Sequence, residues 1–525
     1  MPVEHETSRA TTPHSRDYER RWWTLGVLCL SLVTIVAANA SLNVALPTLA
    51  KDLHAGSSGL QWIVDAYSLV FAGLLLTAGA VGDRWGRRLA LNGGLVVFGA
   101  SSGLAAMSGS VSQLVAARAA MGVGAALVMP ATLSALAHVF PPEERKRAIA
   151  IWAGFAGVGG ALGSVTSGWL LQQFWWGSIF LINVGVAAVA LIAGRFLVPP
   201  SRDERGATLD PVGALLSIAG LGTLIYAIIE APVRGWLSGS TVLTFVAATL
   251  VLLLFGGWEL RAADPMLDLR FFRDPRFTAA TSTITLIFFV MFGMLFVLTQ
   301  YLQSVLGYTP LGAGVRLLPW AAVYLVAAPR SARLVERFGH RRVVSTGLAV
   351  VAVGLALLSR STVHANYPFL ALSMVVIAAG MGMTTAPSTG AIMVSLPLAK
   401  AGVGSAVNDT TRELGGALGV AVVGSILASL YRGDLAGRIA GLPAASSVAS
   451  HSLGAALSAT RALPPQTAAA LVSAARQSYV HAFDLTLVVT VAVALAASAL
   501  VSWLLRPASM RPAEHEAEAV ALDAV

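Results

Sequence analysis

Gly79-Ala-Val-Gly-Asp-Arg-Trp-Gly-Arg-Arg88 is a short basic stretch between two long apolar runs. Its pattern returns once, at Ser331-Ala-Arg-Leu-Val-Glu-Arg-Phe-Gly-His-Arg-Arg342, where the acidic residues, the glycines and the arginines beside them align as Asp83 with Glu336 and Gly86 with Gly339. An internal repeat of this kind is typical of transporters whose substrate path lies between two half-bundles. The repeat therefore predicts two related halves.

The sequence on either side of these loops is apolar over most of its length. Of 525 residues, 56% are hydrophobic and 12% are charged, whereas a soluble protein carries about 25% charged residues. The apolar residues gather in runs such as Leu25–Pro47, Thr241–Trp258 and Leu485–Leu505, each close to the roughly 20 residues that a helix needs to cross a bilayer. The composition predicts an all-α polytopic membrane protein.

Fourteen apolar spans can be read between charged residues and Gly/Pro breaks. They lie near 23–47, 60–81, 89–108, 112–138, 147–170, 175–197, 211–230, 239–259, 278–302, 312–333, 343–360, 368–396, 402–429 and 480–505. The two basic loops then follow spans 2 and 10. We expect two six-helix bundles, at 23–197 and 278–505, separated by a segment at 198–277 that holds two additional helices.

Arginine and lysine are distributed unevenly between the two sets of loops. The loops after even-numbered spans are rich in arginine, whereas the short loops after odd-numbered spans hold few basic residues. Because basic residues favour the cytoplasmic side, we expect both tails, 1–22 and 506–525, in the cytoplasm. Residues 430–479 are Ala/Ser-rich and broken by prolines, which indicates a partly helical external loop.

Four motifs resemble the major facilitator superfamily and, within it, the family of 14-helix drug:proton antiporters. They are the Asp83–Arg88 loop, Arg118-Ala-Ala-Met-Gly-Val-Gly124 in span 4, Asn43-Val-Ala-Leu-Pro47 in span 1, and Ser405-Ala-Val-Asn-Asp-Thr-Thr-Arg-Glu-Leu-Gly-Gly416 in span 13. The resemblance extends from Trp22 to about Trp503. It implies the major facilitator fold and export of drugs by alternating access, driven by the proton gradient.

The basic loop after span 2 is a candidate gating loop, formed by Gly82, Asp83, Arg84, Gly86, Arg87 and Arg88. A tight turn requires glycine for close approach or for positive φ, and Asp83 can cap a helix or pair with an arginine. We therefore expect a latch that breaks as the halves rock. The alternative is that the arginines only anchor the topology.

The chain departs from the antiporter pattern at two positions. Where the resembled family has an aspartate in span 1, five residues before Asn43, this chain has Ala38, and where the family has Gly-Pro in span 5, this chain has Gly159-Gly160. Alanine cannot carry a proton. Either another acid has taken over proton coupling or the protein is not a proton antiporter of the usual kind.

Several ionisable residues lie within predicted spans, where each costs at least about 2.5–3.5 kcal/mol and is by default a functional candidate. Asp65 in span 2 and Arg118 in span 4 lie at similar depth, so we expect them to form a salt bridge with Asp65 as the proton carrier. Asp409, Arg412 and Glu413 lie near the inner end of span 13 and are expected to form a charge network there.

A second set of side chains is a candidate lining for the substrate cavity. Polar and aromatic residues of spans 1 and 2 and the aromatic and methionine run of span 9 are suited to an adaptable apolar cavity, although packing in the core or against lipid would explain them equally well. The candidates are Asn39, Asn43, Trp62, Tyr67, Phe289, Met291, Phe292 and Phe296.

The sequence gives no support for an enzyme, because it contains no phosphate-binding loop, no clustered metal ligands and no nucleophile elbow. We expect no cofactor or metal. The net charge of +9 is assigned to membrane topology and not to nucleic acid binding. The predicted partners are a small amphipathic molecule and membrane lipids, and the chain is expected to act as a monomer in the cell (inner) membrane.

Three functions stay open. The first is a multidrug exporter that is linked to protons. The second is a lipid or secondary-metabolite exporter with altered proton coupling or none, which Ala38 and Gly160 favour. The third belongs to another class: a membrane sensor or assembly partner that does not transport.

Overall fold

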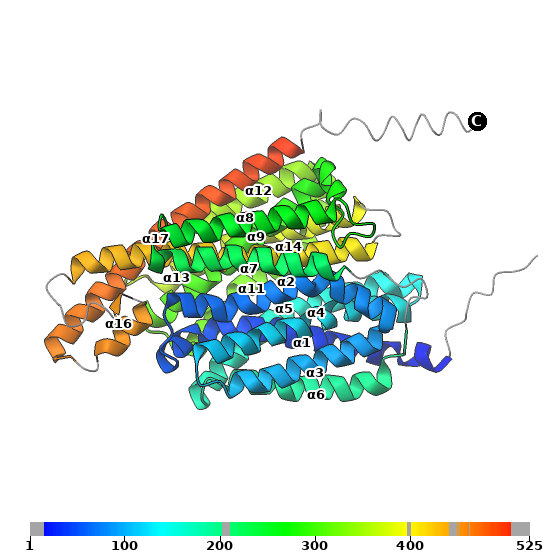
Figure 1. Ribbon diagram of the computed structural model, residues 1–525, viewed down its shortest axis with the longest axis horizontal. Coiled ribbons are helices and arrows are strands. Elements are labelled where there is room, and N and C mark those ends of the chain that lie inside the picture. Colours follow the sequence, from blue (N-terminus) through cyan, green and yellow to red (C-terminus); the bar gives the residue numbers. More distant parts are fainter. Residues whose placement is uncertain are drawn as a thin grey trace, which may run out of the picture.

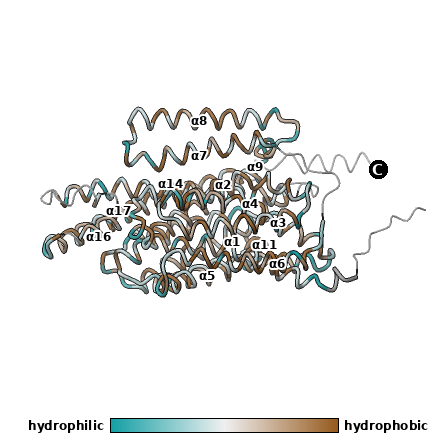
Figure 2. Tube along the Cα trace, turned by 60° about the horizontal axis from the view of Figure 1, so that its bottom comes forward, coloured by the Kyte–Doolittle hydropathy of each residue, from teal (hydrophilic) through white to brown (hydrophobic). Residues whose placement is uncertain are grey.

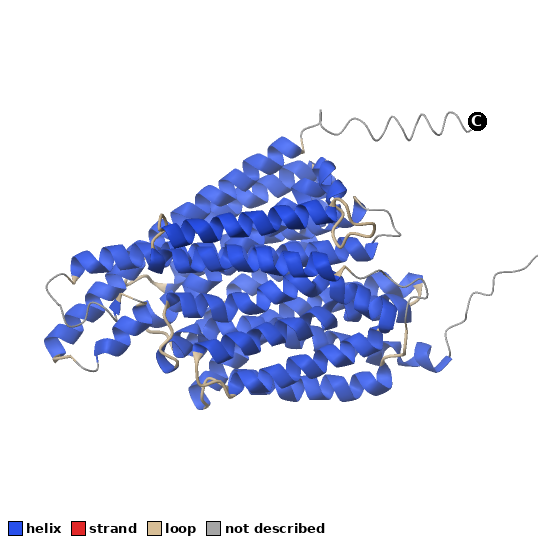
Figure 3. Cartoon of the chain, in the orientation of Figure 1, coloured by secondary structure: helices blue, strands red, loops and turns tan. Residues whose placement is uncertain are grey.

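The computed structural model describes residues 15–201, 210–395, 401–439, 449–450, 452–460 and 463–505. Within these residues every regular element is a helix (Figure 3). Fourteen helical segments among them are long and apolar enough to cross a membrane, which confirms the number predicted from the apolar runs. The predicted C-terminal tail, 506–525, and residues 1–14 of the predicted N-terminal tail lie outside the described residues.

The two halves have the same helix pairs. The first half comprises α1 (Ser15–Asp52), α2 (Ser57–Trp85), α3 (Arg87–Ala106), α4 (Val111–Val139), α5 (Pro142–Gln173) and α6 (Ser178–Leu197). The second comprises α9 (Pro275–Gln300), its continuation η2 (Tyr301–Val305), α10 (Pro310–Arg316), α11 (Leu318–Phe338), α12 (His340–Leu358), α13 (Tyr367–Val394), α14 (Ala401–Arg438), α16 (Leu453–Ala459) and α17 (Pro465–Leu504). In the first half α1 packs on α5, α2 on α4, and α3 on α4 and α6; in the second α9 packs on α14, α11 on α13, and α12 on α13 and α17. The pairing confirms the repeat that the two basic loops predict.

The two additional helices form a hairpin beside the bundle. Helices α7 (Pro211–Arg234) and α8 (Gly239–Glu259) are followed by the short helix η1 (Leu269–Arg273), and Figure 2 shows the pair on one side of the two halves. Helix α7 packs on α2 and α14. The residues of α8 are exposed or half-buried, apart from Thr241, Ala248 and Glu259, as expected of a helix that faces lipid.

Several helix ends differ from the predicted spans. Helix α1 already begins at Ser15, and α14 and α17 extend into the predicted external loop, which also contains α16. These extensions leave the apolar zone, so hydropathy does not detect them, and alanine-rich segments favour helix regardless of burial. The tenth span is broken at Leu317, two residues before Pro319; proline lacks the N–H that a continuous helix would use.

The two basic loops have the same backbone geometry. Gly86 separates α2 from α3 with φ +113°, and Gly339 separates α11 from α12 with φ +81°. Only glycine adopts such angles without strain, so the predicted need for glycine is confirmed at Gly86, and Gly339, which aligns with it, has the same requirement. Gly82 differs: it lies within α2, and a Cβ there would only make an ordinary contact with Ala90 at 3.5 Å.

Small residues let paired helices approach closely, as is common in membrane bundles. In the second half a Cβ on Gly415 or Gly419 of α14 would collide with the backbone of α9. In the first half Gly163 of α5 meets the backbone of α1 at Ala37 in the same way. Gly160 of α5 does not take part in such a contact, because a Cβ there would meet nothing within 4 Å.

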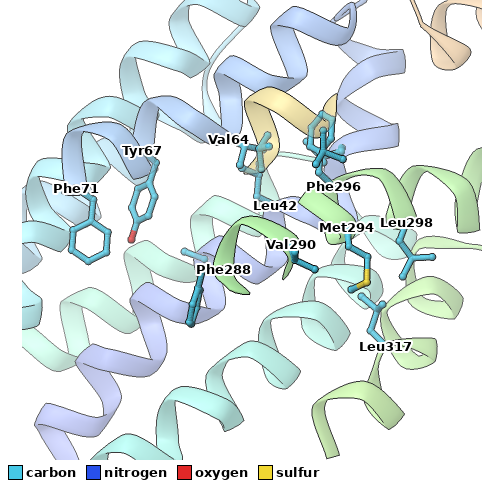
Figure 4. Packing of buried hydrophobic residues seen from close by; sticks show 14 of the residues in the cluster. Leu42, Val64, Tyr67, Phe71, Phe288, Val290, Met294, Phe296, Leu298 and Leu317 are labelled. Carbon is cyan, nitrogen blue, oxygen red and sulfur yellow. The ribbon is translucent and has the colours of Figure 1, made fainter. Parts of the chain in front are cut away.

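The bundle has two chemically different ends. The basic end carries the segments Asp83–Arg88, Glu143–Arg147 and Arg330–Arg342, and the distal end carries the loops before α2, α4 and α10. Figure 1 shows the basic end on the right and α16 at the distal end on the left. One apolar core runs through both halves, and Figure 4 shows part of it, with side chains from α1, α2 and α9 in one layer.

Contacts between the halves gather at the distal end. Gln61 of α2 donates hydrogen bonds to the carbonyl oxygens of Val420 and Ala421 of α14, at 3.1 and 2.8 Å, and Gln303 donates to Val44 at 2.8 Å. Helix α5 packs on α10, so close that a Cβ on Gly168 would meet Leu311 Cα at 2.5 Å. The pairs α2–α14 and α5–α10 correspond under the repeat, as a pseudo-twofold axis requires.

Candidate functional site

Arg118 lies at the centre of the first half and is completely buried. Its Nε donates a hydrogen bond to the carbonyl oxygen of Ile63 at 3.1 Å, and its Nη2 donates to Oδ1 of Asn39 at 3.4 Å. Its guanidinium carbon lies 4.3 Å from the centre of the Tyr67 ring, a cation–π arrangement. One nitrogen, Nη1, is buried without a hydrogen-bond partner.

The predicted salt bridge between Asp65 and Arg118 is wrong for this conformation. No ion pair within 4 Å joins them among the residues described, and both carboxylate oxygens of Asp65 are buried without a hydrogen-bond partner. The reason is rotational. Ile63 and Tyr67 face Arg118, and Asp65 lies two residues from each, which is about 200° around an α-helix. Similar depth did not ensure that the two side chains face each other.

Asp65 instead belongs to the face of α2 that packs against α14 and α7. Gln61, one turn before it, bonds to α14, and Leu69, one turn after it, packs in a cluster with Ala417, Ala421 and Ile225. This cluster is apolar, and among the described residues no cation interacts with the Asp65 carboxyl.

The predicted charge network on α14 is present. Arg412 pairs with Asp409 at 3.5 Å and lies over the ring of Phe288 in α9, 4.6 Å from its centre. Asp409 also accepts a hydrogen bond from Asn408 at 3.3 Å, and Thr389 of α13 donates to Asn408 at 2.9 Å. Asp409 and Arg412 thus have partners within the second half.

Glu413 is directed toward the other half. Its carboxyl interacts electrostatically with Arg412 of its own helix, is within hydrogen-bonding reach of Ser68 on α2, and interacts more weakly with Asp409 and with Arg118 of α4. Its Oε2 atom is buried without a hydrogen-bond partner. The sequence identified Glu413 as part of an inner network, but it did not identify Ser68, or that Glu413 faces Arg118.

The gating-loop candidates lie at the surface of the basic end. Arg87 Nε donates to Asp83 Oδ1 at 3.2 Å, and the backbone N–H of Arg87 donates to the carbonyl oxygen of Ser201 at 2.9 Å. Arg84 is exposed and Arg88 is half-buried. The loop therefore closes on itself in this conformation, and its role as a latch between halves stays a prediction.

The cavity candidates separate into three groups. Asn39 and Tyr67 contact Arg118, and Asn43 donates to the carbonyl oxygen of Asn39 at 3.2 Å. Trp62 faces away from Arg118 and packs near Tyr226 of α7, 6.1 Å between ring centres. The span 9 residues Phe289, Met291, Phe292 and Phe296 are part of the apolar core or packed against it, as the packing alternative predicts.

A cavity of about 390 Å³ that the sequence did not reveal lies toward the basic end, between α2, α9, α14, α17 and the segment before α9. Its lining combines the apolar side chains of Leu76, Leu267, Phe272, Leu286, Val407, Leu414 and Leu500 with the hydroxyls of Thr281, Ser282, Thr285, Thr410 and Thr411. The hydroxyl of Thr410 is buried without a hydrogen-bond partner. Ligand pockets of about 300–1,000 Å³ have this mixture of apolar walls and few polar groups.

Comparison with known proteins gives relatives along almost the whole chain. The model of the Major Facilitator Superfamily matches residues 28–420. The multidrug efflux pump LfrA of Mycolicibacterium smegmatis is 36% identical over 492 residues, covering 94% of this chain and 97% of that protein. The tetracenomycin C resistance and export protein of Streptomyces glaucescens is 33% identical and covers 80% and 78%.

Solved structures share the fold at lower identity. A bacterial homologue of the human lysosomal transporter Spinster, in an inward-facing and unoccupied conformation, is similar with a TM-score of 0.64 at 18% identity, covering 93% of this chain and 99% of that chain. The xylose transporter XylE of E. coli, in an inward-open conformation, gives a TM-score of 0.54 at 16% identity, covering 77% and 90%.

Proposed function

The chain belongs to the major facilitator superfamily, and from this premise we propose that it exports small amphipathic compounds across the cell membrane by alternating access. The observation that carries the proposal is a buried polar centre at the contact of two repeated half-bundles, with an amphipathic cavity of about 390 Å³ beside it. Similarity to a multidrug efflux pump and to a tetracenomycin C resistance and export protein supports export as the direction.

The distribution of charge supports the orientation. Because arginine and lysine collect on the cytoplasmic side of membrane proteins, the basic end faces the cytoplasm and the distal end faces outward. Hydrogen bonds between the halves lie toward the distal end. This conformation therefore corresponds to a transporter that is closed toward the outside and receives substrate from the cytoplasmic side.

The energy source is the proton gradient, taken up by an acid other than the one missing from α1. Ala38 is buried and has no ionisable group. Asp65, Asp409 and Glu413 are the acids within the membrane zone of α2 and α14. We take these three acids as the candidates for proton exchange with the gradient.

Efflux of a lipophilic cationic dye tests the proposal. Cells that lack their own drug exporters and produce this protein should accumulate less ethidium than control cells. Ser282→Phe, which fills the cavity, should reduce efflux, whereas Leu253→Phe, on the exposed face of α8, should not. Equal accumulation with and without the protein at the cell surface contradicts export of this dye class.

The second candidate, export of a secondary metabolite or lipid, is favoured by Ala38 and by similarity to the tetracenomycin C resistance and export protein. Reconstituted vesicles distinguish the two. Transport of a polyketide antibiotic or a fluorescent phospholipid without transport of ethidium would support this second function.

A further inference from the structure

Two buried atoms without partners, one from each half, belong to groups of opposite charge. Arg118 Nη1 in the first half and Glu413 Oε2 in the second are both buried and unpaired. The two groups already interact electrostatically. Among the described residues no ion pair within 4 Å joins them, so a guanidinium from one half and a carboxyl from the other each keep a buried atom without a partner.

Their depths agree. Counted at 1.5 Å per residue, Glu413 lies about 18 Å from the start of α14 at the basic end and Arg118 about 11 Å from the start of α4 at the distal end. Since the hydrocarbon core is about 30 Å thick, both groups lie at nearly the same level, close to its middle. A change in the distance between the halves changes the separation of these two charges directly.

Asp409 and Asp65 are the other acids near the depth of Glu413, and neither is opposite a cation of the other half that lacks a partner. Asp409 pairs with Arg412 on its own helix, and this pair moves as a unit with α14. Asp65 has no hydrogen-bond partner and packs among apolar residues. Movement of the halves therefore changes the distance between Glu413 and Arg118, whereas Asp409 keeps an arginine of its own helix and no cation interacts with Asp65 among the described residues.

The charged and titratable groups around Glu413 come from three helices. Its own helix contributes Arg412 and Asp409, α4 contributes Arg118, and α2 contributes Tyr67 with the hydroxyl of Ser68. Asp65 lies one turn from Ser68 toward the start of α2. Helix α9 contributes the uncharged ring of Phe288.

We infer that Glu413 is the acid that binds and releases the coupling proton, and that Arg118 is the cation with which its carboxylate pairs when the halves approach at mid-depth. In one direction the carboxylate takes up one proton from water on the outer side and becomes a neutral acid, which weakens its attraction to Arg118. In the other it loses that proton to water at the basic end, and the carboxylate that remains attracts the guanidinium. One proton thus enters as substrate leaves.

This inference rests on the proposed function, and two assays on purified protein in vesicles separate them. Ethidium counterflow at equal pH needs alternating access but no net proton transfer, whereas accumulation driven by a pH gradient needs both. In Glu413→Gln we expect counterflow within about twofold of the unmodified protein and driven accumulation reduced at least about tenfold, because an amide cannot take up or release a proton. Asp434→Asn, on the same helix in a pair with Arg438, is the matched control and should retain both activities.

The outcomes that contradict the inference about Glu413 differ from the outcome that contradicts the proposed function. Driven accumulation at the normal level in Glu413→Gln, or its loss in Asp65→Asn alone, overturns the role of Glu413. The role of Glu413 is also contradicted if the unmodified protein shows counterflow but no accumulation driven by a pH gradient. Export by alternating access is then still supported. An unmodified protein without counterflow for any compound tested contradicts the proposed function itself.

A second variant, Glu413→Asp, tests the inference if Glu413→Gln does not fold. Glu413→Asp shortens the side chain and keeps the carboxyl, so driven accumulation should persist with a shifted pH profile, whereas Asp434→Glu should leave the profile in place. An unchanged profile in folded Glu413→Asp contradicts the inference.

Discussion

Arg118 shows how a single cation can be buried at mid-membrane without an ion pair in contact. A carbonyl oxygen, an amide oxygen and an aromatic ring occupy most of its surroundings. Hydrogen bonds to a charged group contribute about 1.5–3 kcal/mol each, and a planar guanidinium serves all three partners at once, whereas lysine is a compact point charge.

Replacing Arg118 by lysine should therefore destabilise the fold although the charge is kept. We expect a loss of about 1.5–3 kcal/mol, the contribution of one hydrogen bond to a charged group, measured as a lower melting temperature in detergent. Arg234→Lys is the control, because Arg234 also lies over a tyrosine and pairs with Glu230, but on an exposed surface. Equal melting temperatures for the two variants would show that lysine reaches the same partners as Arg118.

At this scale the sequence identified most of the right residues but not their partners. Arg118 and Glu413 were named because ionisable groups at membrane depth are costly, and Asn39 and Tyr67 were named as candidate lining of the substrate cavity. Their pairing depends on rotation of one helix about its axis relative to another, and a single sequence does not encode that angle in any local pattern. Only depth can be counted from residue numbers.

Helices and their contacts were predicted to different degrees. Spans follow from apolar runs because the hydrocarbon core requires about 20 apolar residues, so the number of spans is confirmed. Helix ends such as Tyr431–Arg438 of α14 lie outside that zone, and no hydropathy signal marks them. Glycine at Gly415 and Gly419 is visible in the sequence, but its partner α9 is not.

The close contact between α14 and α9 leads to a prediction about the stability of helix packing. A Cβ on Gly419 would lie 2.8 Å from Phe289 Cα and still closer to its carbonyl oxygen, both backbone atoms. Gly419→Ala should lower stability by about 1–3 kcal/mol, the usual cost of overpacking, in thermal unfolding. Gly433→Ala on the same helix meets nothing within 4 Å and should be neutral or stabilising, since alanine favours helix. A similar loss in both variants would mean that the close contact is not responsible.

At the scale of the whole molecule, the internal repeat could be predicted from the sequence, whereas the conformational state of the two halves could not. Matching basic loops at Gly86 and Gly339 predicted two halves, and the paired helices confirm them. Which ends of the halves are in contact depends on an equilibrium between packed states of nearly equal free energy. Neither composition nor motif spacing carries information about that equilibrium.

Contact at the distal end gives the last prediction, which concerns the movement of the halves. Ala50 of α1 and Gly454 of α16 belong to different halves, and a Cβ on Gly454 would lie 3.1 Å from that of Ala50, close to the roughly 3.5–4.5 Å between Cβ atoms in disulfides. The chain has a single cysteine, Cys29, so a Cys29→Ser background leaves only introduced thiols. In that background Ala50→Cys with Gly454→Cys should form a disulfide on oxidation and stop ethidium efflux, because the distal ends can no longer separate, and reduction should restore it.

Gly99→Cys with Ala187→Cys is the control. It joins α3 to α6 within the first half, where the Cβ atoms would lie 3.3 Å apart, and should crosslink without loss of efflux. Continued efflux with the first disulfide fully formed would mean that export proceeds without opening between α1 and α16.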